Sequence, residues 1–361
     1  MREVREKKEE KENQALVNYN FLGSEECPID TQADEIEYSM IFRIPRIEGL
    51  EQCMQLRRLG LRKNLIKRIE GLENNVELQE LELYDNRIRV IENIAHLTKL
   101  VYLDISFNRI AQIQGLETLT GLKKLYLVSN RIKKIEGLEA LVNLEILDIG
   151  DNKLKKLEGL ETLNNLTELY CAKNQLTAIE GVSHLKNLYI LALQANQILK
   201  ISGLDGLEGL TELYLQQNQI ELIEGLDTLS NLETLDIAYN KLTTVSGLTH
   251  TPLLTEVWLN YNQIHDPLST LHAISHLSSL KTIYLADNPL VAPMNASQEN
   301  GYHMQLIQAV PSLEQIDGYM LRQLYAVHAR KEEGVRGITK KEIDPRAKQM
   351  LEDAIMKGNG L

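Results

Sequence analysis

The sequence predicts an α/β solenoid: a horseshoe of stacked strand-and-turn units, with a parallel β-sheet on the concave side and short helical or 3₁₀ turns on the convex side. Three observations predict this fold. An asparagine recurs at 22-residue steps, leucine and isoleucine keep fixed positions around it, and in most units a glycine follows it by seven residues. A repeat of this length has room for one short strand and a return segment, not for a long helix. The asparagines are Asn64, Asn86, Asn108, Asn130, Asn152, Asn174, Asn196, Asn218, Asn240 and Asn262.

Each unit follows the pattern L-x-x-L-x-L-x-x-N-x-I/L-x-x-I/L-x-G-L, and the segment from Leu78 reads L-Q-E-L-E-L-Y-D-N-R-I-R-V-I-E-N-I. This is a leucine-rich repeat. We expect its L-x-L part to be a strand, whose alternation turns both leucines inward and the residue between them outward. The asparagine side chain can then satisfy backbone groups of the turn that would otherwise be buried unpaired. The glycine permits a tight return on the far side.

Both ends of the stack need caps, because each unit buries its apolar edge only against its neighbours. We expect the N-terminal cap within 35–54 and the start of the C-terminal cap within 309–318. The step from Asn262 to Asn288 is 26 residues, so this unit carries four extra residues. We therefore divide the chain into a polar, disordered segment over 1–34, a leucine-rich-repeat domain with its caps over 35–318, and a helical and basic tail over 319–361.

The composition narrows the class of protein. With 39 Lys and Arg against 51 Asp and Glu, the net charge is −12, which argues against nucleic acid as the partner and favours a basic protein. The first residues, MREVREKKEEKENQ, do not resemble a signal or transit peptide, and no apolar run approaches the roughly 18 residues of a membrane span. The three cysteines lack the paired spacing of a zinc site. We expect a monomer of the nucleus and cytoplasm that binds no membrane and no nucleic acid.

The outward strand positions carry the functional prediction. Between the two strand leucines of each unit lies one residue, and these residues form what we call the central column. It holds carboxylates and aromatic rings but no Lys or Arg, a composition typical of protein interfaces. The alternative interpretation, that an acidic chain is acidic everywhere and that tyrosine suits strands, leaves the single tryptophan in register with four tyrosines unexplained. The column is Gly60, Glu82, Asp104, Tyr126, Asp148, Tyr170, Ala192, Tyr214, Asp236, Trp258 and Tyr284.

The sequence indicates no catalytic or metal site. His272 and His276 could share a helical face, but no Glu follows His272 as a hydrolytic zinc motif requires, and we expect both in a surface loop of the longer unit. Carboxylates such as Asp148 and Glu168 could approach one another, yet an open horseshoe has no water-excluding pocket to shift their pKa values. We therefore expect no enzymatic activity, no cofactor and no metal.

The units resemble, in the same order, those of the protein phosphatase 1 regulatory subunit 7 family. The similar units are E-L-Y-D-N-R-I, L-D-I-S-F-N-R-I, L-Y-L-V-S-N-R-I, L-D-I-A-Y-N-K-L, E-V-W-L-N-Y-N and I-Y-L-A-D-N-P-L, and the similarity covers 41–318. Other leucine-rich-repeat proteins share the period, so the order of outward residues is the specific part. The resemblance implies a non-catalytic regulatory subunit that binds the catalytic subunit of Ser/Thr protein phosphatase 1 and controls its activity, maturation or targeting, with roles in mitosis and the cell cycle.

In that family the phosphatase binds across the concave face through acidic and aromatic residues. The family typically has Phe where Tyr126 and Tyr170 stand, and Glu where Asp148 stands. The resemblance also implies that the phosphatase carries the metals, and it allows a further inhibitor subunit. Matched position by position, the binding residues are Asp104, Tyr126, Asp148, Tyr170, Asp236, Glu256, Trp258 and Tyr284.

A second hypothesis stays open. The chain could be a leucine-rich-repeat assembly scaffold of an axonemal or ribonucleoprotein complex, because such proteins share the repeat class. An RNA-associated role would predict basic residues on the concave face or an appended basic domain, and the central column has no basic residue. The main stoichiometric partner in a native extract would distinguish the two hypotheses.

Overall fold

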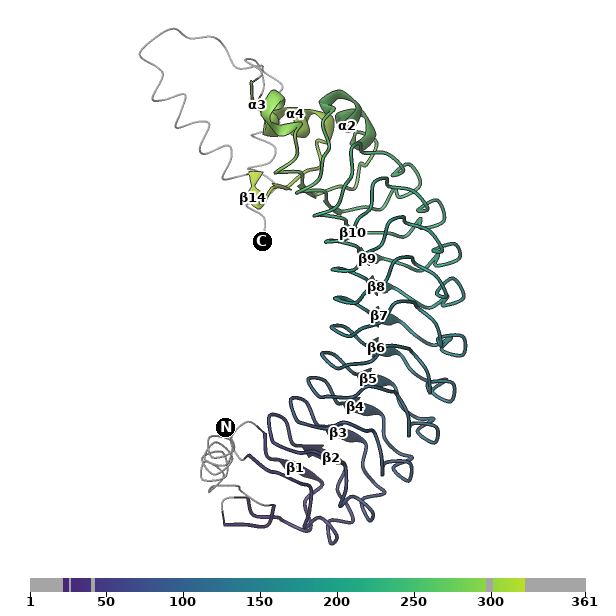
Figure 1. The fold of residues 1–361 in the computed structure, drawn as a ribbon. Coiled ribbons are helices and arrows are strands. Elements are labelled where there is room, and N and C mark those ends of the chain that lie inside the picture. Colours follow the sequence, from purple (N-terminus) through teal and green to yellow (C-terminus); the bar gives the residue numbers. More distant parts are fainter. Residues whose placement is uncertain (1–21, 26, 40–42, 297–300, 322–361) are drawn as a thin grey trace, which may run out of the picture.

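The computed structural model of the protein describes residues 22–25, 27–39, 43–296 and 301–321. These residues form a horseshoe whose short strands follow one another along the concave edge (Figure 1). All strands belong to one sheet in sequence order, in which β13 and β14 pair antiparallel and the other neighbours pair parallel. The predicted solenoid with a concave parallel sheet is confirmed. The strands are β1 Glu35–Glu37, β2 Arg58–Gly60, β3 Glu80–Glu82, β4 Tyr102–Asp104, β5 Lys124–Tyr126, β6 Ile146–Asp148, β7 Glu168–Tyr170, β8 Ile190–Ala192, β9 Glu212–Tyr214, β10 Thr234–Asp236, β11 Glu256–Trp258, β12 Thr282–Tyr284, β13 Gln315–Ile316 and β14 Tyr319–Met320.

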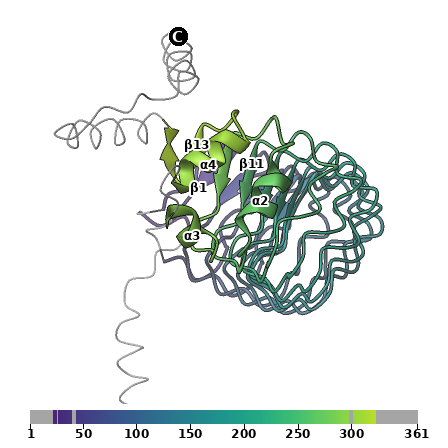
Figure 2. The ribbon, with the colours of Figure 1, turned by 90° about the horizontal axis from the view of Figure 1, so that it is seen from above.

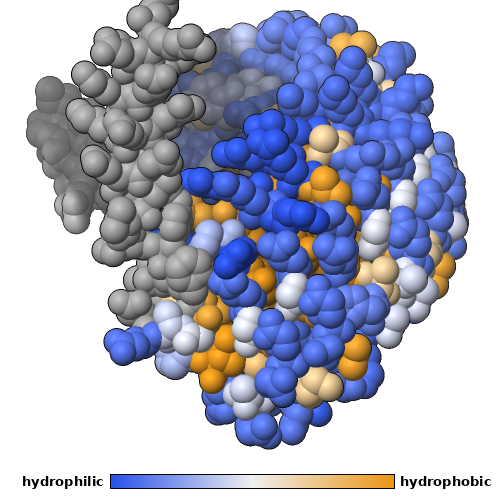
Figure 3. All heavy atoms as spheres, turned by 60° about the horizontal axis from the view of Figure 1, so that its bottom comes forward, coloured by the Kyte–Doolittle hydropathy of each residue, from blue (hydrophilic) through white to orange (hydrophobic). Residues whose placement is uncertain are grey.

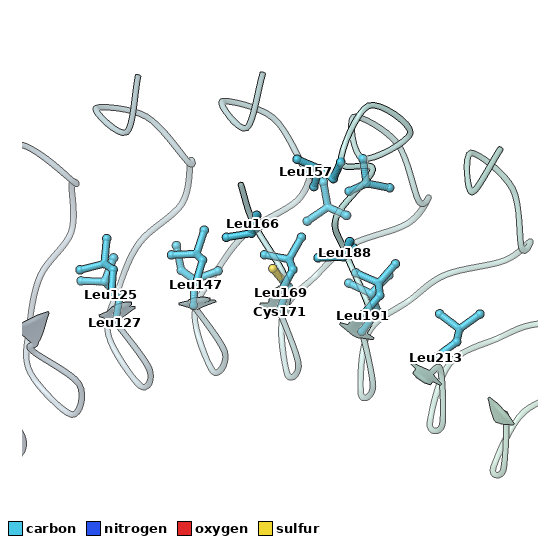
Figure 4. Close-up of a cluster of buried hydrophobic side chains, with 14 of the residues drawn as sticks. Leu125, Leu127, Leu147, Leu157, Leu166, Leu169, Cys171, Leu188, Leu191 and Leu213 are labelled. Carbon is cyan, nitrogen blue, oxygen red and sulfur yellow. The ribbon is translucent and has the colours of Figure 1, made fainter. Parts of the chain in front are cut away.

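The repeat units stack without offset, so equivalent residues of successive units lie side by side. Leu81 of β3 pairs with Leu103 of β4, and both side chains are fully buried, as is Leu83 two positions after Leu81. Figure 4 shows such side chains from neighbouring units, among them Leu147 and Leu169, on the same side of the strands. They belong to one hydrophobic core that runs through the stack. The predicted inward positions are therefore confirmed.

The recurring asparagine ties each unit to the one before it. Nδ2 of Asn152 donates to the carbonyl of Ile149 in its own turn (3.1 Å) and to that of Leu127 in the preceding unit (2.9 Å). Its Oδ1 accepts the backbone N–H of Ile132 (2.9 Å). The same three contacts recur at the other repeat asparagines, and each side chain is buried. Loss of one such side chain would leave buried backbone groups unpaired, at about 1–3 kcal/mol each.

The repeat glycine lies where two units approach most closely. Gly159 has φ +68°, and a Cβ at this position would lie 2.4 Å from the carbonyl oxygen of Ile135 in the preceding unit. Asn93 takes the equivalent position in one unit with φ 59°, and its Nδ2 donates to the carbonyl of Ile69 over 2.8 Å. The return therefore requires glycine, or a residue such as asparagine that accepts the left-handed conformation.

The convex side of the 22-residue units consists of isolated 3₁₀-type turns, as the sequence predicted. Leu141 N–H donates to the carbonyl of Leu138, and Leu144 N–H to that of Leu141, both over 2.9 Å. These separate turns lie three residues apart, so they do not join into a 3₁₀ helix. Within the described ranges, helices occur only near the C-terminal end, where Figure 2 shows them grouped together. They are α2 Pro267–Ile274, α3 Val291–Ala296 and α4 Tyr302–Ala309.

The longer unit uses its extra residues to form α2. Asp266 caps this helix, since its Oδ1 accepts the backbone N–H groups of Leu268 (3.0 Å) and Ser269 (3.4 Å). His272 therefore lies in a helix and not in the surface loop that we expected. His276 follows the helix, and its Nε2 lies 3.2 Å from the carbonyl oxygen of Leu248.

The two ends of the core extend beyond the repeats. Leu22 and Cys27 are buried in the core, although they precede the boundary that we predicted at residue 35. At the other end, β14 folds back onto β13. The predicted disorder over 1–21 and the predicted tail beyond residue 321 lie outside the described residues. No helix among those described has the length and apolar composition to cross a membrane.

Candidate protein-interaction surface

The central column forms a continuous line along the concave sheet. Asp148 pairs with Tyr126 on one side and with Tyr170 on the other, and Trp258 pairs with Tyr284. Adjacent strands lie about 5 Å apart, so residues from many units line up at close, regular spacing. The structure thus places seven of the eight predicted binding residues in this column. The eighth, Glu256, begins strand β11, two positions before Trp258.

The three aspartates of the column have a structural role that the sequence did not reveal. Their Oδ1 atoms accept the backbone N–H two residues later, over 2.9 Å at Asp104 and 3.0 Å at Asp148 and Asp236. Asp104 and Asp236 are only 8% and 2% exposed, and Asp148 is half-buried. Burial raises the pKa of Asp148 and Asp236 to about 6, while the N–H contact lowers it. Burial also raises the pKa of Asp104.

These shifts correct one expectation from the sequence. An open horseshoe was expected to leave its carboxylate pKa values unshifted, but bulky neighbours cover the aspartates. Asp104 is followed on the next strand by Tyr126, and the rings of Tyr102 and Tyr126 have centroids 5.4 Å apart. Asp236 lies between Tyr214 and Trp258 in the paired strands. The aspartates therefore present little exposed negative charge.

The glutamates two positions earlier in the strands hold the tyrosines in place. Tyr170 Oη donates to Glu168 Oε2 over 2.7 Å, and Tyr189 Oη donates to Oε1 of the same carboxylate. Tyr214 Oη donates to Glu212 Oε2 over 2.7 Å. Burial, and then these hydrogen bonds, raise the pKa of Tyr170 and Tyr214. The phenols thus stay neutral, and the accessible negative charge of the surface belongs to the half-buried glutamates.

Trp258 lies at the C-terminal end of the column. Its ring packs against Tyr284 with centroids 4.9 Å apart and planes tilted by 48°. Tyr284 Oη accepts a hydrogen bond from Gln315 Nε2 over 2.7 Å, which fixes the tyrosine from the far side. Trp258 is half-buried, and its Nε1–H is covered without an acceptor among the described residues. The tryptophan therefore presents part of its ring, beside the half-buried Glu256 of the same strand.

The acidic character of the column does not extend to its N-terminal end. Glu82 is only 3% exposed and forms ion pairs with Arg58 (3.0 Å) and with Arg62. Arg58 also contacts Glu35 (2.8 Å) and Glu80 (3.4 Å). The column itself has no basic residue, as the sequence indicated, but these arginines reach it from neighbouring positions. The acidic and aromatic surface therefore begins at β4.

A set of aromatic residues that the repeat pattern did not single out lies at the edge of the sheet. Phe107, Tyr239 and Tyr261 each precede a repeat asparagine, have φ between 54° and 56°, and are nearly half exposed. Tyr239 and Tyr261 stack with centroids 4.2 Å apart, and Phe107 packs against Tyr84 at 4.8 Å. Bulky residues rarely adopt this left-handed conformation. Aromatic residues directly before the repeat asparagine are therefore unusual, and their place in the pattern could have marked them as candidate surface residues.

The described part of the chain contains little that could perform chemistry. No group of three His, Cys, Asp or Glu side chains in it is arranged to hold a metal ion. Cys27, Cys53 and Cys171 are all buried, and Cys53 and Cys171 are free thiols. Burial raises the pKa of the Cys171 thiol, which disfavours the reactive thiolate.

Comparisons with known proteins agree with this architecture. The family model for leucine-rich repeats (2 copies) matches residues 76–118, 120–162, 164–206 and 208–250. The chain has the leucine-rich-repeat solenoid fold. No curated protein sequence matches it significantly. This solenoid fold typically serves as a protein-interaction scaffold, which agrees with a half-exposed acidic and aromatic concave face.

Solved structures of other leucine-rich-repeat proteins are similar in fold. An internalin (inlF) from Listeria monocytogenes has a TM-score of 0.68 and 24% identity, covering 79% of this chain and 86% of the internalin. An LRR protein from Leptospira interrogans has a TM-score of 0.55 and 23% identity, covering 76% of this chain and 81% of that one. YopM from Yersinia enterocolitica has a TM-score of 0.57 and 21% identity, covering 78% of this chain and 59% of YopM. At these identities the similarity shows the fold alone.

Proposed function

We propose that this leucine-rich-repeat protein is a non-catalytic regulatory subunit that binds the catalytic subunit of Ser/Thr protein phosphatase 1 through its concave face. Binding would control the activity, maturation or targeting of the phosphatase in the nucleus and cytoplasm, including during mitosis and the cell cycle. The bound phosphatase would supply the catalytic metals. A further inhibitor subunit could join through surfaces that the concave face leaves free.

One observation carries the proposal: the column residues that resemble the phosphatase-binding residues of the regulatory subunit 7 family lie in register on one concave surface. Asp148 and Tyr170 pair directly, as do Asp236 and Trp258. A folded partner could therefore contact residues from β4 to β12 at the same time. Aromatic rings half-covered by their neighbours are pre-organised for binding, because they lose little side-chain freedom when a partner covers them.

The charge of this surface favours a basic partner. Glu168, Glu212 and Glu256 are partly exposed on neighbouring parts of the sheet, and the chain carries a net charge of −12. Complementary charge speeds the encounter of two proteins and selects against acidic partners. Ion pairs at the rim of an interface contribute little affinity each, so the aromatic rings should supply most of the binding free energy.

Affinity purification of the full chain from a native extract tests the proposal. We expect the catalytic subunit of protein phosphatase 1 as the main stoichiometric partner. Recovery should fall when Trp258 is replaced by alanine and should persist when the exposed Leu268 of α2 is replaced instead. A dynein or small nuclear ribonucleoprotein component as the main partner would contradict the proposal and favour the assembly-scaffold hypothesis.

A further inference from the structure

The flank of the first repeats has a charge opposite to that of the chain as a whole. The relevant positions are the first, third and fourth after each repeat asparagine, between the strand and the convex turn. In the five units that begin at Asn64, these fifteen positions hold eleven cations and no anion. In the next five units, which begin at Asn174, the same positions hold only Lys200 and Lys241 as cations and include two acids. We call the eleven the basic flank: Lys67, Arg68, Arg87, Arg89, Arg109, Arg131, Lys133, Lys134, Lys153, Lys155 and Lys156.

The fold holds these cations close together. The backbone N–H of Arg109 donates to the carbonyl of Ile88 in the preceding unit over 2.8 Å, and the equivalent bond recurs at Arg87, Arg131 and Lys153. The first-position cations therefore stack in one row along the solenoid. Around the first of them lies an open pocket of about 610 Å³, lined by Lys67, Arg68, Arg87, Arg89, Val90, Glu92 and Arg109.

Most of this positive charge is left without a partner. All eleven side chains are exposed. Among the described residues, only Arg68 and Lys134 form ion pairs, with Glu92 at 3.0 Å and Glu136 at 3.9 Å. The remaining nine repel one another across neighbouring units. A row of like charges costs stability unless a ligand of opposite sign covers it.

We propose that the basic flank is a docking site for a short, extended, acidic polypeptide segment of another protein. The row from Arg87 to Lys153 crosses three unit steps, about 15 Å at the spacing of adjacent strands. An extended peptide covers that distance with about five residues. Arginine and lysine would contact its carboxylates, or the phosphates of phosphorylated side chains, through charge-assisted hydrogen bonds.

Two features favour a narrow peptide over nucleic acid. None of the fifteen positions carries an aromatic ring on which a base could stack. A row of acidic residues, which includes Glu92, Glu136 and Glu158, lies two residues after the last position of the basic flank in the repeat. This acidic row would repel a wide polyanion but would leave room for a single extended chain. Figure 3 shows the face at the end of the molecule where the first repeats lie, which is mostly hydrophilic with scattered hydrophobic patches.

Fluorescence anisotropy with a labelled oligoglutamate of about 12 residues, at about 50 mM and about 300 mM salt, tests this site. The flank variant combines Arg87→Gln, Arg109→Gln and Arg131→Gln. The matched control combines Lys173→Gln, Lys200→Gln and Lys241→Gln, which removes the same charge from exposed positions in the later units. A second flank variant with Lys133→Gln, Lys155→Gln and Lys156→Gln guards against a local effect on folding. A single-stranded oligonucleotide of equal charge serves as the competing ligand.

We expect the wild type to bind the peptide more weakly at high salt, and each flank variant to lose about tenfold in affinity, since it lacks three exposed ion pairs that each contribute modestly. The control should stay within about twofold. Equal losses in flank and control variants would overturn the proposal, because net charge alone would then explain binding. Tighter binding of the oligonucleotide than of the peptide, or no peptide binding at low salt, would overturn it as well. The outcome does not depend on protein phosphatase 1, because the concave face is unchanged in every variant.

Discussion

Trp258 and Tyr284 pack against each other from adjacent strands, with ring centroids 4.9 Å apart, and Gln315 holds the tyrosine hydroxyl from the far side over 2.7 Å. This contact fixes the single tryptophan of the chain in one place while part of its ring stays accessible. Aromatic residues held in partly covered positions are typical anchors of protein interfaces. The pair therefore marks the end of the concave face where binding free energy should concentrate.

Replacement of Trp258 by alanine should weaken binding of the phosphatase catalytic subunit by at least about 2 kcal/mol. Tyr284→Ala should have a smaller effect, because much of the tyrosine is already engaged with its neighbours. Titration calorimetry with the purified catalytic subunit measures both, after circular dichroism has shown that each variant is folded. Leu268→Ala serves as control, since this side chain is 79% exposed on α2, away from the sheet. Unchanged affinity in folded Trp258→Ala would place the binding site elsewhere.

Association with a basic partner should slow as salt rises, because exposed charges are screened beyond a Debye length of about 8 Å. The structure assigns this steering to the glutamates. The double variant Glu212→Gln and Glu256→Gln should flatten the dependence of the association rate on ionic strength. Asp104→Asn with Asp236→Asn, a change of equal charge at nearly covered positions, should alter it much less. Stopped-flow measurements of the association rate at several salt concentrations test this prediction. A wild-type association rate that does not depend on salt concentration would argue against an acidic docking face.

The repeat made most of the fold predictable. A side chain such as Leu147 can be assigned to the inward face of its strand from its place in the pattern. Because the same place recurs in every unit, the register of neighbouring strands and the curvature of the solenoid can be predicted as well. Asn152 could also be assigned to its turn. Its bond to the carbonyl of the preceding unit, Leu127 O, could not, because that contact depends on how closely two units stack. The burial of Leu22 and Cys27 was missed for a related reason: they lie outside the repeat.

The candidate site was only partly predictable. The column of outward residues follows from strand alternation alone, and Trp258 and Tyr170 lie where this predicts. Strand alternation does not predict how far side chains from adjacent units bury an outward residue. Asp236 has an outward position but is almost fully buried by its neighbours. The charge of Glu82 is neutralised by Arg62, which lies two positions after the end of strand β2. Such contacts depend on side-chain lengths across adjacent units, which a one-dimensional pattern does not contain.

Alanine in place of Gly159 should destabilise the fold by more than about 1 kcal/mol, because the left-handed conformation is unfavourable for alanine and its Cβ would lie 2.4 Å from Ile135 O. Gly121→Ala is the matched control. At Gly121 the nearest atom to an added Cβ is 3.7 Å away, at ordinary contact distance. Urea unfolding followed by circular dichroism measures both variants. Equal midpoints would show that the return turn relaxes without cost and that the glycine is not required there.

Asp148 and Asp236 should make stability depend on pH in a direction opposite to that of most carboxylates. Burial raises the pKa of Asp148 and Asp236 from 3.8 to about 6 in the folded state. Between these values the folded chain binds more protons than the unfolded chain, so the contribution of these groups to stability falls as pH rises from about 4 to about 6 and stays low above it. Near neutral pH the folded state therefore carries the cost of one buried and one half-buried charge.

Asp148→Asn and Asp236→Asn should remove that cost, because the amide oxygen can still accept the backbone N–H two residues later. Each variant should be more stable than wild type at pH 7.5, by on the order of 1–3 kcal/mol given about 1.4 kcal/mol for each pKa unit. The gain should shrink toward zero near pH 4, where the wild-type carboxyls are protonated. Urea unfolding at both pH values measures it, with Asp205→Asn at an exposed position as control. A gain that is the same at both pH values would show that the carboxylates do not titrate in this window, and loss of stability at pH 7.5 would show that the folded protein prefers the charged form.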